Sequence, residues 1–209
     1  MPRTPDLVDL ILASASPRRR ELLERLGLVL EVAPADVDET PHPGEKPVDY
    51  ARRVAAAKCD VVAEGTGAGR ALAVLGADTT VIVEDAILGK PADDADARAM
   101  LARLCGRRHE VVTAYTLRFG DRRLERAVTT LVAMRALQPS EIDAYVASGE
   151  GRDKAGAYAV QGIAAAFVTE LRGSLTNVIG LPLAEVLADL LALGALPRYP
   201  PPGFGVTPA

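Results

Sequence analysis

The sequence predicts an α/β protein with a mixed, partly antiparallel central sheet flanked by helices. Strand-like and helix-like segments alternate along the 209 residues, which is typical of α/β folds. Two long strand-like runs, 110–119 and 122–135, flank Gly120-Asp121 and predict an antiparallel hairpin within that sheet. The balance of 49% hydrophobic and 25% charged residues indicates an ordered globular chain.

A strand, a turn and a helix are predicted first. Residues 7–13 form a compact apolar run of strand length, and Ser16 and Pro17 mark the start of a helix. Serine is favoured as an N-cap and proline at the first helical position, whereas glycine favours the helix end, here Gly27. We therefore expect a strand that leads directly into a helix N-terminus.

The other elements are predicted from the spacing of apolar residues that is typical of helices or of strands, and from glycine and proline at their boundaries. Further strands are expected at residues 28–33, 71–77, 79–83, 86–88 and 163–171. Further helices are expected at residues 48–63, from Asp93 to Gly106, from Pro139 to Ala147 and from Leu181 to Gly194. The glycine-containing segments 65–69 and 151–162 are expected to be a flexible connection and a loop.

One domain is expected at residues 1–196, because the length fits a single domain, compact or elongated with two lobes. The segment 197–209 contains five prolines and no periodicity, so it predicts an extended or disordered C-terminal tail. No run approaches the ~18 apolar residues of a membrane span, and no signal-peptide stretch is visible. A membrane is therefore not expected as a partner.

The net charge and the cysteine content restrict the class of ligand and the cellular compartment that we expect. A formal net charge of −4 gives no global attraction for nucleic acid, so a bound polyanion would need a local cluster of positive charge. Cys59 and Cys105 lie far apart without metal-binding spacing, which favours a reducing compartment. The sequence therefore favours a cytoplasmic protein with a small phosphorylated ligand and no nucleic-acid partner.

The first candidate site is the predicted helix start, which contains Ser14, Ser16, Arg18 and Arg19. A helix N-terminus presents free backbone N–H groups and partial positive charge, so it attracts phosphate. The two guanidinium groups add planar donors that match phosphate oxygens. On this pattern alone, a phosphate site and a capped helix with solvated arginines fit equally well.

The second candidate is Asp78, which lies in the apolar segment 74–83. A carboxylate in such a segment is costly unless it is paired or bound to a metal. The alternative is a structural aspartate that accepts hydrogen bonds from turn amides. We favour a functional carboxylate.

Seven other polar residues are weaker candidates individually. They are Glu39, Lys58, Lys90, Asp153, Lys154, Tyr158 and Gln161. The first three lie in a turn, on a helix and at a strand end, where solvated side chains are common. The last four crowd one loop with three glycines, which indicates ligand contact, with a surface loop as the alternative.

Several chemistries are excluded. His42 and His109 lack zinc-ligand spacing, so a metal would have to be a hard cation held by carboxylates, Mg²⁺ or Mn²⁺. The glycines at 65–69 precede a predicted strand instead of following one, which argues against a dinucleotide-binding fingerprint. The sequence contains neither a Walker A loop nor a Gly-X-Ser-X-Gly elbow.

In order along the chain, these residues fall in short blocks that resemble the Maf family of nucleoside triphosphate pyrophosphatases, from Leu10 to about Leu193. Each block is weak by itself, but the ordered series is specific. The blocks are Ser14-Ala-Ser-Pro-Arg-Arg19, Asp38-Glu39, Lys58, Gly76-Ala-Asp-Thr79, Lys90-Pro91, His109-Glu-Val-Val-Thr113, Asp153-Lys-Ala-Gly-Ala-Tyr158, Gln161-Gly162 and Gly180-Leu-Pro-Leu183.

The resemblance implies an elongated, two-lobed fold and hydrolysis of a nucleoside triphosphate between its α and β phosphates. Asp78 matches the family's proton acceptor. Glu39, Lys58 and Lys90 match the acid and the lysines expected around metal and phosphates, with Asp78 and Glu39 as ligands of Mg²⁺ or Mn²⁺. The resemblance also suggests a homodimer.

The resemblance further bears on the choice of base. Arg18, Thr79 and Gln161 match positions that contribute to this choice, and the stretch 154–161 resembles the branch that acts on dTTP and UTP. The branch that acts on 7-methyl-GTP tends to place glutamate where this chain has Gln161. An amide both donates to and accepts from a uracil or thymine edge, whereas a carboxylate suits a cationic methylated guanine.

Two alternatives stay open. Members of the family have been linked to inhibition of septum formation, so the same cleft could serve a nucleotide-binding regulator with little turnover. Pyrophosphatase action on modified nucleotides such as 7-methyl-GTP is the other alternative. The presence of an acid, a base and phosphate donors favours an enzyme over the regulator, and the stretch 154–161 favours dTTP and UTP as its substrates.

Overall fold

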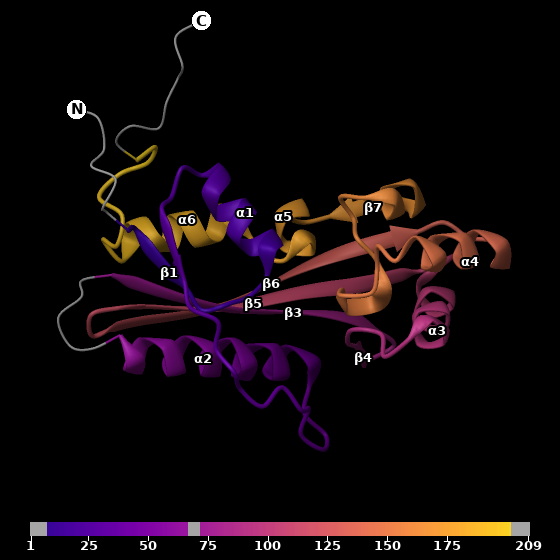
Figure 1. Ribbon diagram of the computed structural model, residues 1–209, viewed down its shortest axis with the longest axis horizontal. Helices are drawn as coiled ribbons and strands as arrows, with labels where there is room; N and C mark the ends of the chain where they lie inside the picture. The colour runs from indigo at the N-terminus through magenta and orange to yellow at the C-terminus, as the bar shows by residue number, and fades with distance from the viewer. Residues whose placement is uncertain (1–7, 67–71, 202–209) are drawn as a thin grey trace, which may run out of the picture.

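Residues 8–66 and 72–201, which a computed structural model of the protein describes, contain a mixed sheet of seven strands (Figure 1). The strands are β1 (Leu10–Leu12), β2 (Leu30–Val32), β3 (Ala73–Val83), β4 (Ala86–Leu88), β5 (Arg108–Phe119), β6 (Arg122–Met134) and β7 (Val168–Arg172). Their order is β2-β1-β3-β5-β6-β7, with β4 beside β3. β1 pairs in parallel with β2 and β3, and the other pairs are antiparallel. The predicted mixed sheet and its central hairpin are confirmed.

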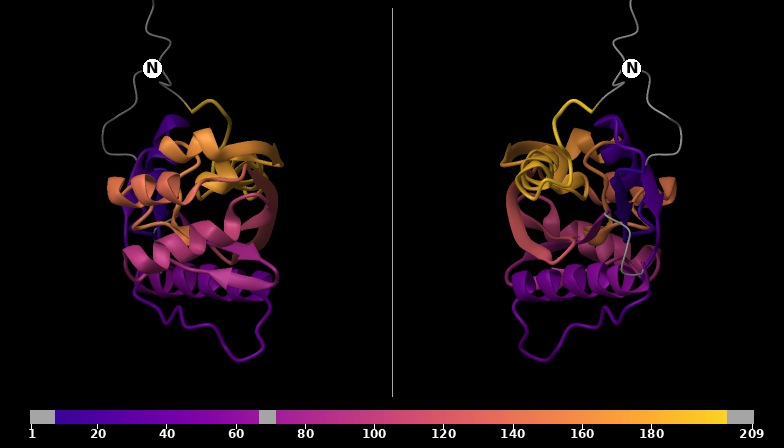
Figure 2. Two further views of the ribbon diagram at one scale, coloured as in Figure 1. Left: turned by 90° about the vertical axis from the view of Figure 1, so that its right-hand side faces the viewer. Right: turned by 90° about the vertical axis from the view of Figure 1, so that its left-hand side faces the viewer.

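Helices cover both faces of the sheet (Figures 1 and 2). They are α1 (Pro17–Arg25), α2 (Pro47–Gly65), α3 (Asp94–Leu104), α4 (Pro139–Ser148), α5 (Leu175–Ile179) and α6 (Leu183–Ala192), with 3₁₀ helices η1 (Ala155–Ala157) and η2 (Ile163–Phe167). Side chains alternate across β3, so Leu75 packs in the cluster with α1 and α6, whereas Val74 and Ile82 pack in clusters with α2.

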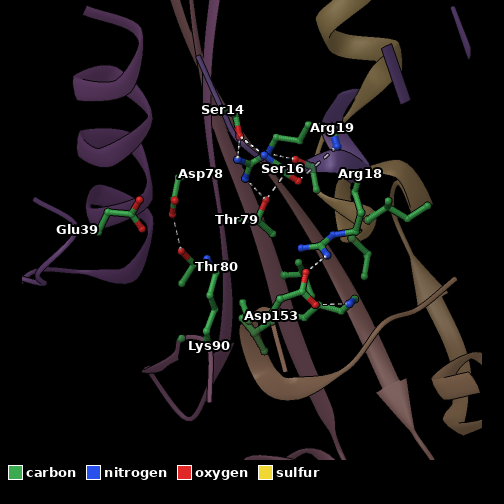
Figure 3. Close-up of a pocket in the computed structure, with 18 of the residues that line it drawn as sticks. Ser14, Ser16, Arg18, Arg19, Glu39, Asp78, Thr79, Thr80, Lys90 and Asp153 are labelled. Atoms are coloured by element: carbon green, nitrogen blue, oxygen red, sulfur yellow. Dashed lines mark hydrogen bonds and ion pairs between the residues drawn. The ribbon is translucent and has the colours of Figure 1, made fainter. Parts of the chain in front are cut away.

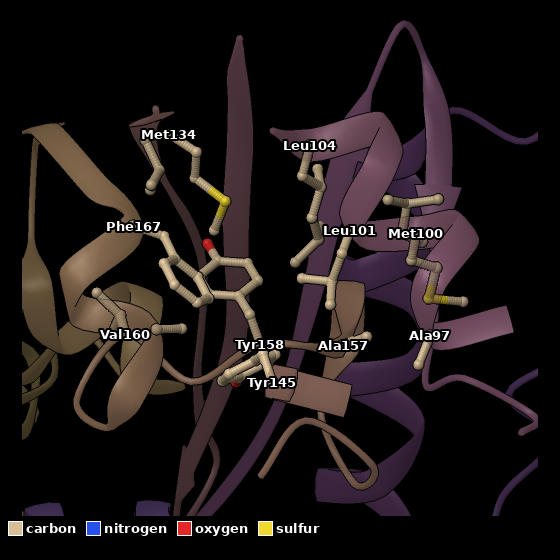
Figure 4. Packing of buried hydrophobic residues seen from close by; sticks show 14 of the residues in the cluster. Ala97, Met100, Leu101, Leu104, Met134, Tyr145, Ala157, Tyr158, Val160 and Phe167 are labelled. Atoms are coloured by element: carbon tan, nitrogen blue, oxygen red, sulfur yellow. The ribbon is translucent and has the colours of Figure 1, made fainter. Parts of the chain in front are cut away.

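The apolar side chains opposite α2 form two separate clusters along the sheet. One contains Leu23 of α1 and Leu190 of α6. The other gathers Leu101 of α3, Tyr158 and Phe167 at the far end of the same face (Figure 4). The two clusters build two lobes on the elongated sheet, as expected.

Strand β3 is continuous, which corrects one prediction. The sequence predicted two strands, 71–77 and 79–83, interrupted at Asp78, but Asp78 lies inside the strand and pairs with Ala114 of β5. The strand does not break because the side-chain charge is compensated by Lys58, whose Nζ lies 3.0 Å from Asp78 Oδ1. A paired carboxylate is tolerated in an apolar segment.

The predicted strand 163–171 is wrong in its first half. Residues Ile163–Phe167 form η2, and β7 begins only at Val168. The N–H groups of Ile163 and Ala164 donate to the carboxylate of Glu150 instead of to a neighbouring strand. Helix α5, five residues long, was not predicted because so short a helix leaves no periodicity to detect.

Several expectations concern residues outside the described part of the chain, which leaves out 1–7, 67–71 and 202–209. They include most of the connection 65–69 and most of the tail 197–209. Among the helices that are described, none combines the length and apolar character that crossing a membrane requires.

Helix α2 and strand β3 approach each other closely at Gly76. A Cβ atom at Gly76 would lie 2.5 Å from both the carbonyl oxygen of Ala55 and the amide nitrogen of Cys59. Glycine is therefore required there, because any side chain would push the helix away from the sheet. The same contact brings Lys58, the neighbour of Cys59, over the carboxylate of Asp78.

We expect Gly76→Ala to lower the free energy of unfolding by about 3 kcal/mol, because the added methyl group overpacks a backbone contact. Urea denaturation measures this change. Gly65→Ala is the matched control, since a Cβ atom there meets nothing within 4 Å, and a change of no more than about 0.5 kcal/mol is expected for it. Equal stability of the two variants would contradict the close approach.

His109 of β5 is a buried histidine with an incomplete set of partners. Its Nε2 lies 2.8 Å from the Tyr158 hydroxyl, and its Nδ1 has no hydrogen-bond partner within the described residues. Burial lowers the pKa of His109 to about 4, because a charged imidazolium is disfavoured away from water. The ring is therefore neutral in the folded protein at neutral pH.

The neutral His109 predicts a specific loss of stability in acid. Above pH 6.5 the ring is neutral in both the folded and the unfolded chain, but between pH 6.5 and about 4 only the unfolded chain takes up the proton. We expect this proton to account for about 3 kcal/mol of lost unfolding free energy across that interval. In His109→Gln the pH dependence should weaken by that amount. Parallel curves for wild type and His109→Gln would refute the buried neutral ring.

Candidate active site

A gap in the edge of the sheet opens onto a cleft. β1 pairs with β3 only up to Leu75, and β4 pairs with β3 only from Val81 onward. Between these points, residues 76–80 have a strand neighbour on the β5 side alone. The cleft at this gap has a volume of about 710 Å³ (Figure 3).

The gap gives one cleft access to both faces of the sheet. Asp78 and Thr79 are consecutive in β3, so their side chains point to opposite faces. Asp78 faces α2, where it contacts Lys58, and Thr79 faces α1, where its Oγ1 accepts a hydrogen bond from Arg19. Both residues line the cleft because it lies at the edge where the two faces meet.

The structure brings every site residue predicted from the sequence to the lining of this cleft. These residues are Ser14, Ser16, Arg18, Arg19, Glu39, Lys58, Asp78, Thr79, Lys90, Lys154 and Gln161. They come from the ends of β1 and β4, from β3, α1 and α2, and from the loops after β2 and α4. Nine of them fall into three groups by their contacts, and Lys90 and Gln161 stand apart from these groups.

The first group surrounds the start of α1. Ser16 caps the helix, since its Oγ accepts a hydrogen bond from the amide of Arg19 at 3.4 Å, and Pro17 occupies the first helical turn, as predicted. Ser14 Oγ accepts from the amide of Ser16 at 3.2 Å. The helix N-terminus faces the cleft with its partial positive charge, which suits an anion.

Arg19 is buried and ties three segments together. Its Nε donates to the carbonyl oxygen of Gly180 at 2.9 Å, Nη1 to Ser14 Oγ at 3.0 Å and Nη2 to Thr79 Oγ1 at 3.0 Å. Burial lowers the pKa of this guanidinium, which the charge of Asp78 opposes. Each terminal nitrogen of the group keeps a second N–H for a ligand.

The second group is a charge cluster on the α2 side of the gap. Lys58 Nζ lies 2.8 Å from Glu39 Oε1 and 3.0 Å from Asp78 Oδ1. Asp78 and Lys58 are buried, whereas the side chain of Glu39 is 51% exposed. Within residues 8–66 and 72–201, Asp78 Oδ2 accepts only a long hydrogen bond, 3.3 Å from Thr80 Oγ1, so it is the carboxylate oxygen best able to take a further partner.

The third group lies across the cleft from the charge cluster (Figure 3). Asp153 Oδ2 accepts from Arg18 Nη1 at 2.9 Å, and its Oδ1 accepts from Lys154 Nζ at 2.5 Å. Although partial burial raises it, the hydrogen bonds from Lys154 and Arg18 hold the pKa of Asp153 at about 2. One carboxylate therefore holds two of the predicted phosphate ligands.

Two predicted ligands have no such partner. Within the described residues, neither the Lys90 ammonium nor the Gln161 amide makes a side-chain hydrogen bond or ion pair, yet both groups belong to residues that line the cleft. Gln161 lies in a turn closed by a hydrogen bond from the amide of Gly162 to the carbonyl of Ala159 at 3.0 Å. These two side chains are available to a ligand.

A buried polar network behind the cleft was missed by sequence reasoning. Asn177 is 0% exposed, and its Nδ2 donates to the Val111 carbonyl and to Thr130 Oγ1, each at 2.9 Å. The carbonyl of Asn177 accepts from Thr113 Oγ1, which lies 2.9 Å from Thr79 Oγ1. The network thus fixes the hydroxyl that Arg19 contacts. An asparagine in a polar stretch carries no sequence signal for such a role.

The carboxylates of the cleft could supply only part of the ligands of a metal ion. Within the described residues no group of three or more His, Cys, Asp or Glu side chains is placed to hold a metal ion. Asp78 and Glu39 supply two carboxylates to one cluster, and Mg²⁺ is commonly bound by one or two carboxylates together with substrate phosphates and water. The donors therefore fit a divalent cation held jointly with a phosphorylated ligand.

The fold and the cleft define the class first: an α/β protein with a polar cleft suited to a phosphorylated ligand. A family model described as Maf-like protein matches residues 9–193. The chain is 51% identical over 191 residues to the dTTP/UTP pyrophosphatase of Cereibacter sphaeroides, covering 91% of this chain and 97% of that protein. It is 52% identical over 189 residues to the dTTP/UTP pyrophosphatase of Anaeromyxobacter dehalogenans, covering 88% and 94%. The chain belongs to the Maf family.

Among solved structures, the Ham1 protein of Staphylococcus aureus is similar over 88% of this chain and 98% of that chain, with 16% sequence identity and a TM-score of 0.49.

Proposed function

We propose that the protein hydrolyses nucleoside triphosphates, dTTP and UTP above all, to the nucleoside monophosphate and pyrophosphate. The observation that carries this proposal is the juxtaposition of a buried carboxylate, Asp78, with a cation-rich cleft in a chain about half identical to dTTP/UTP pyrophosphatases. The carboxylate provides a base for water, and the cations provide the charge that a triphosphate requires.

The triphosphate binds across the gap in the sheet edge. Lys90 makes no ion pair with any residue in the described part of the chain, and it meets phosphate directly. Arg18 and Lys154 exchange the carboxylate of Asp153 for phosphate oxygens, which are acceptors of the same kind. The start of α1, with Ser14 and its spare N–H groups, adds neutral donors.

Asp78 accepts the proton of the attacking water. Its Oδ1 is held by Lys58, so the carboxylate is oriented and Oδ2 is directed to the remaining partner. The water oxygen forms a new bond to phosphorus, its proton passes to Asp78, and the bond between the α and β phosphates breaks with release of pyrophosphate. Arg19 and Lys90 offset the negative charge that develops on the leaving group.

Mg²⁺ or Mn²⁺ would be held by Asp78, Glu39 and phosphate oxygens, and would supply charge neutralisation for the phosphates. Glu39 has the greater freedom, because its side chain is half-exposed and contacts only Lys58 among the described residues. The two carboxylates carry one negative charge more than Lys58 offsets, which suits the binding of a cation at this cluster.

Gln161 selects the base. Its amide, at the tip of a turn, has no hydrogen-bond partner among the residues that the structure describes. An amide can donate to and accept from a uracil or thymine edge at once. Arg18 lines the same cleft and contributes to this choice. Thr79 acts indirectly, since its hydroxyl contacts Arg19 and Thr113.

A panel of nucleoside triphosphates tests the proposal. The purified protein is incubated with each triphosphate and Mg²⁺ or Mn²⁺, and monophosphate and pyrophosphate are quantified. We expect release from dTTP and UTP in excess of that from purine nucleotides. Binding without release from any nucleotide would favour the nucleotide-binding regulator, and preferred release from 7-methyl-GTP would favour the modified-nucleotide enzyme.

We expect Asp78→Asn to lower kcat by roughly 100-fold or more, because the amide cannot take the proton of the water. The amide oxygen still accepts from Lys58, so the melting temperature should change little. Asp121→Asn, in the exposed turn between β5 and β6, is the control and should keep full activity. Near-normal turnover of Asp78→Asn would refute the assigned base.

We expect Gln161→Glu to lower kcat/KM for dTTP and UTP by roughly tenfold relative to 7-methyl-GTP, because a carboxylate only accepts hydrogen bonds. Gln138→Glu makes the same chemical change at the N-cap of α4, away from the cleft, and should leave this ratio unchanged. An unaltered preference in Gln161→Glu would remove the base-reading role.

A further inference from the structure

The turn that carries Gln161 lies between η1 and η2 and belongs to neither a helix nor a strand. It spans Ala159 to Gly162, and the bond between these two residues is its own internal support. Selection of a base requires donors and acceptors held within a few tenths of an ångström. The turn therefore needs further anchors, and two buried or half-buried side chains outside the cleft supply them.

Glu150 anchors the side of the turn that follows Gln161. Its Oε2 accepts from the amide of Ile163 at 2.8 Å, and its Oε1 accepts from the amide of Ala164 at 3.3 Å. The carboxylate lies directly against the backbone of Gly162, since a Cβ atom there would be 2.1 Å from Glu150 Oε2. Only glycine admits the carboxylate at this distance.

Tyr145 anchors the side of the turn that precedes Gln161. Its hydroxyl accepts from the amide of Ala159 at 3.1 Å and donates to Glu150 Oε1 at 2.9 Å. The ring is buried and packs edge-to-face on Phe167 with 5.2 Å between centroids (Figure 4). Packing of the ring in the core and the hydrogen bond to the Glu150 carboxylate thus fix the position of the Tyr145 hydroxyl.

We infer that Glu150 and Tyr145 are positioning residues that set the base preference by holding the Gln161 turn from both ends. Neither residue lines the cleft. Capping of η2 alone would require only the bonds that the amides of Ile163 and Ala164 donate to Glu150. The bond that the amide of Ala159 donates to the Tyr145 hydroxyl lies on the other side of the turn and adds nothing to that cap. The inference rests on the proposed role of Gln161.

Two gentle variants test the pair. Glu150→Gln keeps the shape but turns one acceptor oxygen into a donor, which then faces a backbone N–H. Tyr145→Phe keeps the ring and removes only the hydroxyl with its two bonds. Glu141→Gln is the matched control, because Glu141 also accepts from a backbone amide, that of Gln138 at 2.8 Å, and does not line the cleft.

The readout is the ratio of kcat/KM for UTP to that for CTP. Uracil has a carbonyl group where cytosine has an amino group, so a Gln161 amide that is displaced no longer distinguishes the two bases. We expect the ratio to fall roughly tenfold in Glu150→Gln and in Tyr145→Phe, and to stay unchanged in Glu141→Gln. In a Gln161→Ala background the same two changes should have no further effect on the ratio, because they act through Gln161.

An unchanged ratio in Tyr145→Phe, with its melting temperature retained, would overturn the inference even if Glu150→Gln did not fold. Additive loss in the Gln161→Ala background would overturn it as well. Failure of the wild-type protein to hydrolyse any nucleotide would instead contradict the proposed function. Amide hydrogen exchange of residues 159–164 in the nucleotide-free protein then tests whether Glu150 and Tyr145 hold the turn. Faster exchange is expected in both variants, and rates equal to those of the wild type would refute the positioning role.

Discussion

The close contact between α2 and β3 at Gly76 is the constraint on which the rest of the site depends. Without a side chain at Gly76, the helix backbone meets the strand backbone, and Lys58 reaches the carboxylate of Asp78. That pairing allows a charged residue inside an apolar strand, so β3 continues through the site to β4. The strand then presents Asp78 and Thr79 to the cleft, and it holds these side chains more rigidly than a loop would.

Part of the positive charge in the cleft is paired with carboxylates before any ligand binds. Lys58 is shared by Asp78 and Glu39, and Asp153 is shared by Arg18 and Lys154. A phosphorylated ligand therefore exchanges with Asp153 at two cations, whereas Lys90, which makes no ion pair among the described residues, is open to it. This arrangement is consistent with the net charge of −4, which gives the protein no general attraction for polyanions.

Local features of the fold and site could be predicted from the sequence, whereas contacts between distant segments could not. The Ser16 cap and the β5–β6 hairpin depend on adjacent residues, and both were predicted. Asn177 is 64 residues from Thr113 and 47 from Thr130, so no local pattern indicates its place in the network. The first half of the strand predicted at 163–171 was wrong because Glu150, 13 residues before Ile163, binds amides that a neighbouring strand would need.

The gap at residues 76–80 also bears on how the sheet meets other chains. An unpaired strand edge exposes backbone donors and acceptors to which a further strand can add, which is a common start of aggregation. Here the open edge is only five residues long, is bounded by β1 and β4, and carries the buried ion pair of Asp78 and Lys58. A strand that entered the gap would have to desolvate these charges. The residues proposed for chemistry thus also keep a further strand from pairing at this gap.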